Sequence, residues 1–225
     1  MEKNKLPNKI GIVGFKGSGK DSLAKQFIEI GYEKYAFADS LKDVLSATFG
    51  WERHLLEGET DESRIWREEP DVWWEEKLGW TDHLNFRSVF PRFTPRVAMQ
   101  LVGTDIFRKY FNDNLWILSL ENKIRNKTNI VISDCRFPNE IKMIRDNGGI
   151  IIRVIRGDEP EWYKVGLDAA NGNNSAKEYL LSKQIHMSEW AWLNQDFDIE
   201  IHNNSTPEKM FNTLLSYFTK PIITL

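Results

Sequence analysis

The stretch GFKGSGKD, residues 14–21, decides the fold of this chain because it fits the G-x-x-x-x-G-K part of the P-loop pattern. Its last residue, Asp21, stands where Ser or Thr is usual. The apolar run 10–13 before it is typical of a buried parallel strand. Apolar residues then recur at helical spacing until Gly31, which is expected to end a helix. The loop therefore joins a strand to a helix, as the motif requires.

The chemistry of this loop favours phosphate binding. Its glycines let the backbone N–H groups point inward, and with the N-terminus of the following helix they form an anion site. Lys20 adds a positive charge for the outer phosphates. A glycine-rich turn that binds nothing is the alternative, but the Gly-Lys pair and both flanking elements favour a ligand. We predict phosphate contacts from Gly14, Lys16, Gly17, Ser18, Gly19, Lys20, Asp21 and Ser22.

Composition limits the classes of protein to consider. The 225 residues suffice for one sizeable α/β domain with an insertion, or for two small ones. A net charge of −3 gives no basic excess, so a nucleic-acid polymer is not an expected partner. Cys135 is the single cysteine, which excludes an intrachain disulfide and favours a reducing compartment.

Nothing in the sequence indicates a membrane partner. No apolar run approaches the roughly 18 residues of a membrane span, and the N-terminus lacks the apolar core of a signal peptide. We therefore expect a cytoplasmic protein, located in the host cytoplasm if a phage encodes it.

Residues 51–95 differ from the rest of the chain. They follow a short strand expected at 35–38 and a helix expected at 41–50, which Asp39 and Ser40 can cap. They mix dense charge with five of the nine tryptophans, Trp51, Trp66, Trp73, Trp74 and Trp80. We interpret this segment as a helical, Trp-rich insertion that covers the acceptor side of the sheet. Core and lid packing explains such a cluster better than a base-stacking platform does.

The remaining segments alternate between helices and strands. We predict strands at 129–134, 150–155 and 197–201, the last an edge strand because its apolar residues alternate with polar ones. We predict helices at 96–110, where Gly103 weakens the pattern, at 114–125, from Pro138 to Gly148, and from Pro207. The polar region 157–196 is expected to form a lid of loops and short helices. The whole predicts an α/β fold, a parallel five-stranded sheet with helices on both faces, whose ligands bind at the carboxyl ends of the strands.

Two acids are candidates for a magnesium site. Asp21 replaces the usual hydroxyl ligand, and its carboxylate could hold Mg²⁺ directly or through water, with the Ser22 hydroxyl nearby. Asp134 ends a buried strand at the ligand edge, where a second magnesium-side acid is expected. The alternative role of Asp134 is to cap the helix that begins near Pro138.

Several arginines are candidates for binding phosphate. Arg136 follows a strand end, and Arg92 and Arg96 flank a helix start. A guanidinium suits bidentate phosphate contacts, yet from spacing alone Arg136 is equally a surface charge or an ion-pair partner. For Arg92 and Arg96 the spacing favours a surface charge or an ion pair over phosphate binding. His186 and Glu189 could form an acid–base pair, but phosphoryl transfer does not require one, and we assign them no catalytic role.

Taken together, these residues resemble the phage-type deoxynucleoside monophosphate kinases. The loop ends in Gly-Lys-Asp, as in that family, and Trp116 matches a family tryptophan. The other matching blocks are FADSLKD at 37–43, RVAMQLVGTD at 96–105, SDCRFPNE at 133–140, HMSE at 186–189 and NNST at 203–206. Within the first of these, Ser40 stands where proline is common. The order and spacing of the blocks are specific.

The resemblance implies a single three-layer, adenylate-kinase-like P-loop domain over residues 1–225 that transfers phosphate from ATP to a deoxynucleoside monophosphate (dNMP), with Mg²⁺. It implies catalytic roles for Lys20, Arg136 and Asp134, and an ATP contact at Asn204 beside the adenine. It also makes a homodimer plausible. The implied dNMP-binding residues are Lys42, Arg96, Gln100, Gly103, Thr104, Trp116, Asp134, Arg136 and Glu140.

Two other functions stay open at this point. Animal phosphomevalonate kinase shares the Gly-Lys-Asp loop, so the loop alone also fits a kinase for another small phosphorylated acceptor. A nucleotide-dependent switch or binding module would use the same loop without turnover, and its partner surface would be the Trp-rich insertion. The preferred base of a dNMP acceptor does not follow from these motifs.

Overall fold

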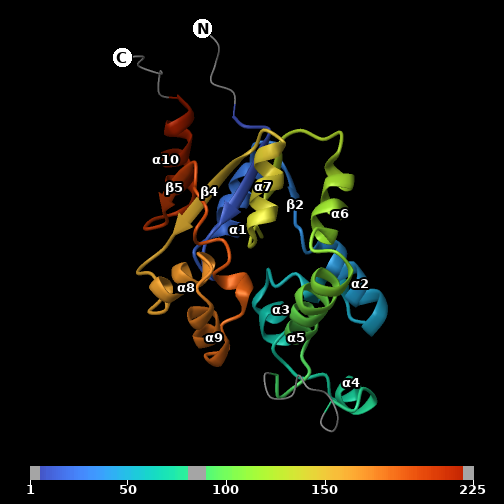
Figure 1. Cartoon of the computed structure of the whole chain (residues 1–225). Coiled ribbons are helices and arrows are strands. Elements are labelled where there is room, and N and C mark those ends of the chain that lie inside the picture. The colour runs from blue at the N-terminus through green and yellow to red at the C-terminus, as the bar shows by residue number, and fades with distance from the viewer. Residues whose placement is uncertain (1–5, 81–89, 220–225) are drawn as a thin grey trace. The chain divides into compact units, whose positions relative to one another are not determined.

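The computed structural model describes residues 6–80 and 90–219. Five strands form one sheet in the order β2-β3-β1-β4-β5, and all four neighbouring pairs are parallel. The strands are β1 (Lys9–Val13), β2 (Glu33–Tyr35), β3 (Ile130–Ile132), β4 (Ile150–Ile155) and β5 (Ile199–His202). The predicted α/β fold with a parallel five-stranded sheet is thus confirmed (Figure 1).

The centre of the sheet is fully buried because its strands are continuous runs of apolar, mostly β-branched residues. β1 pairs with β3 on one side and with β4 on the other, so that Gly11 lies opposite Ile132 and Ile151. Ile12 and Ile132 have no exposed surface. Because β1, β3 and β4 are parallel, their carboxyl ends lie at one edge of the sheet.

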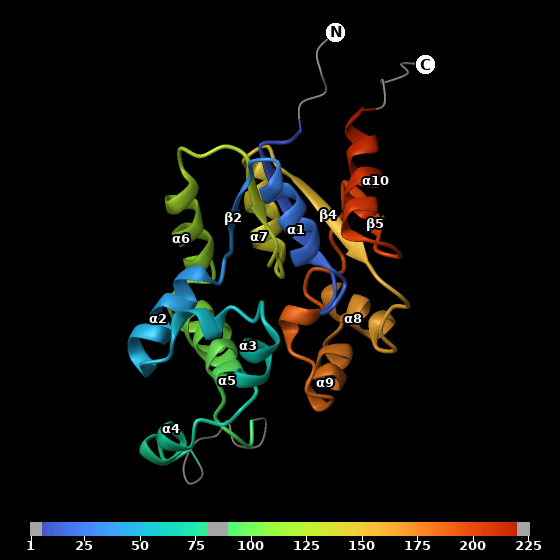
Figure 2. The same cartoon turned by 180° about the vertical axis from the view of Figure 1, so that it is seen from behind.

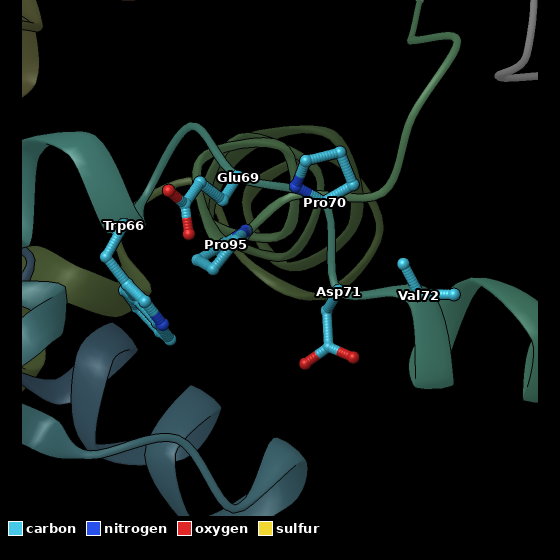
Figure 3. Close-up of a pocket in the computed structure, with 6 residues that line it drawn as sticks. All are labelled: Trp66, Glu69, Pro70, Asp71, Val72 and Pro95. Atoms are coloured by element: carbon cyan, nitrogen blue, oxygen red, sulfur yellow. The ribbon is translucent and has the colours of Figure 1, made fainter.

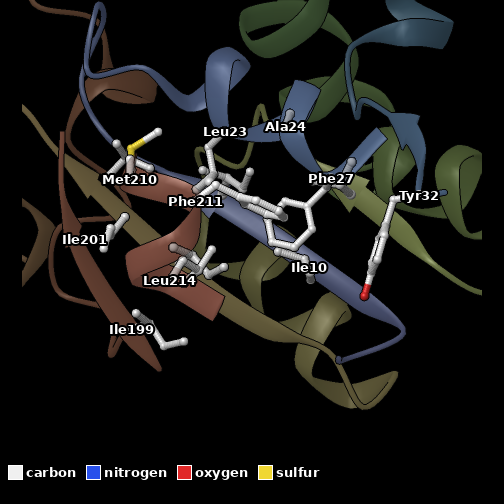
Figure 4. Close-up of a cluster of buried hydrophobic side chains, with 14 residues drawn as sticks. Ile10, Leu23, Ala24, Phe27, Tyr32, Ile199, Ile201, Met210, Phe211 and Leu214 are labelled. Carbon is white, nitrogen blue, oxygen red and sulfur yellow. The ribbon is translucent and has the colours of Figure 1, made fainter. Parts of the chain in front are cut away.

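Helices cover both faces of this sheet. On one face α1 (Lys20–Glu29) and α10 (Pro207–Thr219) pack together, with Phe27 and Phe211 in edge-to-face contact at 5.0 Å (Figure 4). On the other face lies α7 (Pro138–Asp146), which Figures 1 and 2 show from the front and from behind. Ile144 of α7 packs closely on Gly11: a Cβ added at Gly11 would lie 2.7 Å from the Cδ1 atom of Ile144.

The chain divides into two compact units, one formed by residues 1–36 with 124–225 and the other by residues 37–123. The first contains the sheet and the helices just described. It also contains three short elements in the segment predicted as lid-like, namely α8 (Tyr163–Ala170), α9 (Asn174–Ser182) and the 3-10 turn η3 (Met187–Glu189).

The second unit is helical and has its own aromatic core. Trp51, Trp80, Phe93 and Trp116 are buried in it, whereas Trp73 is 57% exposed. The core-packing interpretation is therefore confirmed for Trp51 and Trp80 and is wrong for Trp73. The elements of this unit are α2 (Asp39–Phe49), η1 (Arg53–Leu56), α3 (Asp61–Trp66), α4 (Val72–Lys77), α5 (Pro95–Gln100), η2 (Leu101–Phe111) and α6 (Leu115–Ile124).

The helix predicted at 96–110 is present but changes its winding. It begins as α5 and continues as the π-helix η2, which contains Gly103. A Cβ at this glycine would lie 2.5 Å from Leu41 Cδ2 of α2. Glycine therefore occurs in mid-helix because two helices approach closely there, a reason that helix propensity does not reveal.

Two local predictions are wrong in position. β2 covers Glu33–Tyr35 rather than residues 35–38, because it pairs with only three residues of β3. Asp39 and Ser40 do not cap α2, whose N-cap is Ala38, and Ser40 instead hydrogen bonds Ser119 through their hydroxyls at 2.6 Å. Within residues 6–80 and 90–219, no helix combines the length and the apolar character that a membrane span needs.

Candidate active site

The P-loop of this chain is shaped by glycines between β1 and α1. Gly14 and Gly19 have φ angles of 146° and 102°, which side-chain-bearing residues rarely adopt. A Cβ at Gly14 would also lie 2.5 Å from the Val154 carbonyl oxygen of β4, and one at Gly19 would meet the Asn203 amide. Ser18 N donates to the Phe15 carbonyl at 3.1 Å and closes the turn.

Asn203 braces the loop from the other end of the chain. Its side-chain amide donates to the Ser18 carbonyl at 2.8 Å, and its backbone N donates to the Ile155 carbonyl at 2.7 Å. The segment after β5 is therefore fastened to the P-loop and to the end of β4. Asn203 belongs to the NNST block, but the sequence did not predict that it contacts the P-loop. Asn204 is exposed, and its contact with ATP stays a prediction.

Lys20 is the first residue of α1, and its ammonium folds back onto the loop. It donates to the Gly14 carbonyl at 2.6 Å and to the Phe15 carbonyl at 2.8 Å. Burial, and then repulsion by Arg136, lower the pKa of Lys20 to about 8, while Asp21 and Glu189 act weakly in the opposite direction. Burial therefore disfavours the charged ammonium in the free protein, and a bound anion would favour it again.

Asp21 lies in the first turn of α1 with its side chain 63% exposed. The Ser133 hydroxyl donates to Asp21 Oδ1 at 3.0 Å, and Lys34 Nζ lies 3.6 Å from the same oxygen. Sequence spacing did not identify Ser133 as a site residue. Its position at the end of a buried strand, next to the candidate Asp134, could have indicated that it lies in the site.

The residues present fit a magnesium ion that arrives with a nucleotide. Across residues 6–80 and 90–219, no group of three or more His, Cys, Asp or Glu side chains is placed to hold a metal. Mg²⁺ commonly needs only one or two protein carboxylates, because phosphate and water oxygens fill its other positions. Asp21 beside the P-loop offers one such carboxylate.

Glu140 has a structural task at the start of α7. Its Oε2 atom accepts from Arg136 N at 2.7 Å and from Phe137 N at 3.1 Å, and the residue is only 4% exposed. Phe137, not Asp134, is the N-cap of this helix, so the alternative role considered for Asp134 is not what the structure shows. Glu140 therefore fixes the backbone of the residue that carries the candidate phosphate-binding guanidinium.

The Arg136 side chain reaches the HMSE block. Its Nη1 atom donates to Glu189 Oε1 at 2.9 Å and approaches Ser188 Oγ at 3.5 Å. His186 Nδ1 lies 2.9 Å from the same Ser188 hydroxyl. The block thus supplies a carboxylate partner for Arg136.

Six of the predicted acceptor residues lie in the unit of residues 37–123. Two of them are ion-paired there, Lys42 with Glu57 at 2.6 Å and Arg96 with Glu68 at 2.7 Å. Arg92, the other arginine considered, pairs with the buried carboxylate of Glu75 at 2.8 Å. The full set in this unit is Lys42, Arg96, Gln100, Gly103, Thr104 and Trp116.

Trp116 and Gly103 form one structural pair within that set. The Trp116 indole donates to the Gly103 carbonyl at 2.8 Å, and Trp116 is 7% exposed. The family match at these positions is therefore explained by a buried hydrogen bond between η2 and α6. Whether they also contact an acceptor stays a prediction, as do Gln100 and Thr104.

Each unit contains a hollow of modest size. One, of about 190 Å³, adjoins the P-loop and is lined by residues 15–18 and 153–160. The other, of about 250 Å³, lies in the helical unit between Trp66, Glu69, Pro70, Asp71, Val72 and Pro95 (Figure 3). Its carboxylates make it a poor phosphate site, and Asp71 already accepts from Trp51 Nε1 at 2.8 Å.

Comparisons with known proteins show which proteins this chain resembles. The sequence model of the family described as deoxynucleotide monophosphate kinase matches residues 83–165, a range that includes the blocks at 96–105 and 133–140. A protein of Acanthamoeba polyphaga mimivirus, provisionally named a deoxynucleotide monophosphate kinase, is 28% identical over 223 residues. That alignment covers 92% of this chain and 94% of the viral protein.

A second relative and a solved structure complete the comparison. The deoxynucleoside-5'-monophosphate kinase of Escherichia phage T5 is 26% identical over 200 residues, which cover 67% of this chain and 78% of the phage protein. The dephospho-CoA kinase of Campylobacter jejuni aligns with a TM-score of 0.41 and 14% identity over 95% of this chain and 98% of its own. The chain is thus similar in sequence to proteins named as deoxynucleotide monophosphate kinases, the family that its motifs resemble.

Proposed function

We propose that the chain transfers the γ-phosphoryl group of ATP to the 5'-phosphate of a deoxynucleoside monophosphate, giving a deoxynucleoside diphosphate and ADP. The observation that carries this proposal is the P-loop geometry, in which Gly14 and Gly19 have positive φ and the Lys20 ammonium folds back onto the Gly14 and Phe15 carbonyls. Burial and Arg136 also lower the pKa of Lys20 to about 8. Two cations held near each other at the N-terminus of α1 are stabilised by a bound polyanion. A pair of phosphorylated substrates supplies that charge.

On the donor side, the loop amides and Lys20 would bind the outer phosphates of ATP. The Lys20 ammonium already bonds to the Gly14 and Phe15 carbonyls, and phosphate oxygens would replace them as acceptors. Asp21 would hold Mg²⁺ directly or through water, and the ion would neutralise charge on the phosphates when bound. Asn204 is the proposed contact beside the adenine.

On the acceptor side, Arg136 and Arg96 would bind the monophosphate. Arg136 pairs with Glu189 and Arg96 with Glu68, and the proposal is that the acceptor phosphate replaces these carboxylates. A phosphate offers three strong acceptor oxygens in place of a carboxylate's two, so exchange of partners is favourable. The family resemblance adds Lys42, Gln100, Gly103, Thr104, Trp116, Asp134 and Glu140 to the proposed acceptor set.

The reaction itself needs no general base. The attacking group is an oxygen of the acceptor phosphate, which is already ionised at neutral pH. The bond from the γ-phosphorus to the bridging oxygen breaks as the bond to the acceptor oxygen forms, and ADP leaves with the electron pair. Positioning and positive charge therefore suffice, and His186 is not required. Residues 51–95 and 157–196 are the proposed covers that would exclude water.

One coupled assay tests the proposal. ADP formation is measured with ATP and Mg²⁺ in the presence of dTMP, dGMP, dCMP or dAMP, and without an acceptor. We expect turnover only with an acceptor, and the ranking identifies the preferred base. Lys20→Ala should abolish turnover while the protein stays folded, and Arg136→Ala should weaken acceptor use far more than ATP binding.

The same assay separates the alternatives. Slow ATP hydrolysis that is indifferent to every acceptor would favour a switch or binding module and refute the kinase assignment. An active Lys20→Ala variant would also refute the assignment, because Lys20 is the side chain proposed to hold the transferred phosphate. Equal losses of ATP and acceptor binding in Arg136→Ala would place Arg136 in a structural role.

A further inference from the structure

Ser133 is a buried residue whose contact the proposed reaction does not yet use. It lies just after β3, is only 5% exposed, and donates its hydroxyl to Asp21 Oδ1 at 3.0 Å. The bond joins residues 112 positions apart in the sequence. It therefore links the first turn after the P-loop to the strand that neighbours β1.

The two bonded residues stand in places that P-loop enzymes use for magnesium. The common arrangement combines a Ser or Thr hydroxyl from the loop with an Asp carboxylate from a strand end. In this chain the loop supplies the carboxylate, Asp21, and the strand end supplies the hydroxyl, Ser133. The carboxylate and the hydroxyl thus come from the opposite sides of the usual arrangement and are in contact, and Asp134 follows Ser133 in the chain.

We propose that Ser133 is a positioning residue that orients Asp21 toward the magnesium of a bound nucleotide. This inference rests on the proposed function, since it assumes a magnesium nucleotide at the P-loop. Asp21 alone is poorly constrained because its side chain is 63% exposed. A buried hydroxyl at a strand end is rigid, so its bond selects one orientation of the mobile carboxylate.

The geometry of the contacts supports this role. Ser133 Oγ and Lys34 Nζ both approach Oδ1 of Asp21, at 3.0 and 3.6 Å. With Oδ1 engaged in this way, Oδ2 is the oxygen directed to an ion or its water. Lys34 lies beyond hydrogen-bond distance and attracts without fixing a direction, so orientation depends on Ser133. Partners of metal-binding carboxylates typically contribute about 10- to 100-fold to metal affinity.

The experiment measures magnesium dependence rather than activity. Binding of a non-hydrolysable ATP analogue to the full chain is followed by calorimetry, over a range of Mg²⁺ concentrations and in EDTA. Mg²⁺ is expected to increase the affinity for the analogue. For Ser133→Ala we expect the Mg²⁺ concentration that gives half of this increase to rise about 10-fold, while the affinity in EDTA stays unchanged. Ser133→Thr keeps the hydroxyl and should stay close to wild type.

Two further variants separate positioning from stability. Ser46→Ala removes another side-chain hydrogen bond, to the Trp51 carbonyl at 2.6 Å, and should leave the magnesium dependence unchanged. The double variant Asp21→Ser with Ser133→Asp restores the common arrangement. It should regain magnesium dependence that the single Asp21→Ser variant loses, even if Ser133→Ala folds poorly.

The outcomes are distinct. If the nucleotide affinity of the wild-type protein does not depend on Mg²⁺, the proposed function itself is refuted. A magnesium-dependent wild type combined with an unaffected Ser133→Ala variant would overturn only the present inference. Asp21→Ser with wild-type magnesium dependence would also overturn it, because the carboxylate would then have to come from elsewhere, with Asp134 the nearest choice. Rescue by the exchanged pair supports it.

Discussion

The lowered pKa of Lys20 leads to a prediction about protons. In the free protein this pKa is about 8, because the ammonium is partly buried and faces Arg136. Bound phosphates supply the missing negative charge and raise the pKa again. Nucleotide binding at a pH near 8 should therefore take up protons from the solution, by the linkage between binding and titration.

The size of the uptake follows from the pKa. At pH 8 about half of the free molecules carry a neutral Lys20, so binding should take up about 0.5 proton per nucleotide. At pH 7 only about one tenth are neutral, and the uptake should fall to about 0.1 proton. Because nucleotide binding raises the pKa of Lys20, nucleotide affinity is highest below pH 8. The affinity decreases as pH rises through the pKa of Lys20 in the free protein.

Calorimetry in buffers of different ionisation enthalpy measures this uptake directly. The analogue is titrated with Mg²⁺ at pH 7 and pH 8, without an acceptor. Lys20→Arg is the matched control, because it keeps the charge but does not titrate in this range, and it should show no uptake. Arg136→Gln removes the second cause of the low pKa and should reduce the uptake at pH 8. Proton release, no uptake at pH 8, or an unchanged uptake in Lys20→Arg would refute the reasoning.

Three further predictions concern contacts around the site. Gly19→Ala should weaken nucleotide binding and lower stability by about 1–3 kcal/mol more than Gly31→Ala in thermal unfolding, because both have positive φ but only Gly19 faces the Asn203 amide. Equal effects would exclude that contact as the cause. Glu140→Gln should cost about 1–2 kcal/mol in urea unfolding, since a buried anion that accepts two backbone N–H groups is lost. Glu208→Gln in the first turn of α10 is exposed and should be nearly neutral, and a similar loss there would contradict the argument. Trp116→Phe should cost about 1–3 kcal/mol because the Gly103 carbonyl loses its buried donor, whereas exposed Trp73→Phe should cost little; similar unfolding midpoints would refute it.

Much of the fold follows from local sequence patterns. β1, β3 and β4 are short, almost purely apolar runs, and such runs form strands only where both faces are covered. Pro138 and Pro207 begin the helices predicted for them. The errors occur where tertiary packing overrides local preference, as at the start of α2 and at Gly103, where a close approach to Leu41 explains the glycine.

The candidate site was predicted less completely because its contacts join distant residues. Arg136 was identified from its position after a strand, but its partner Glu189 lies 53 residues away and was assigned no role. Asn203 and Ser18 are 185 residues apart, and no spacing rule connects them. Glu140 was assigned to the acceptor from family resemblance, whereas its visible contacts are with backbone N–H groups.

The sequence by itself determined the P-loop, the alternation that makes a parallel sheet, and the edge of that sheet where ligands are expected. These features depend on residues within a few positions of one another, and their physical causes are glycine conformations, apolar periodicity and helix caps. Only the tertiary structure decided which groups surround Lys20 and Asp21. The charge of Arg136 and the hydroxyl of Ser133 reach them across the sheet edge, and side-chain contacts over such separations are set by packing rather than by local sequence.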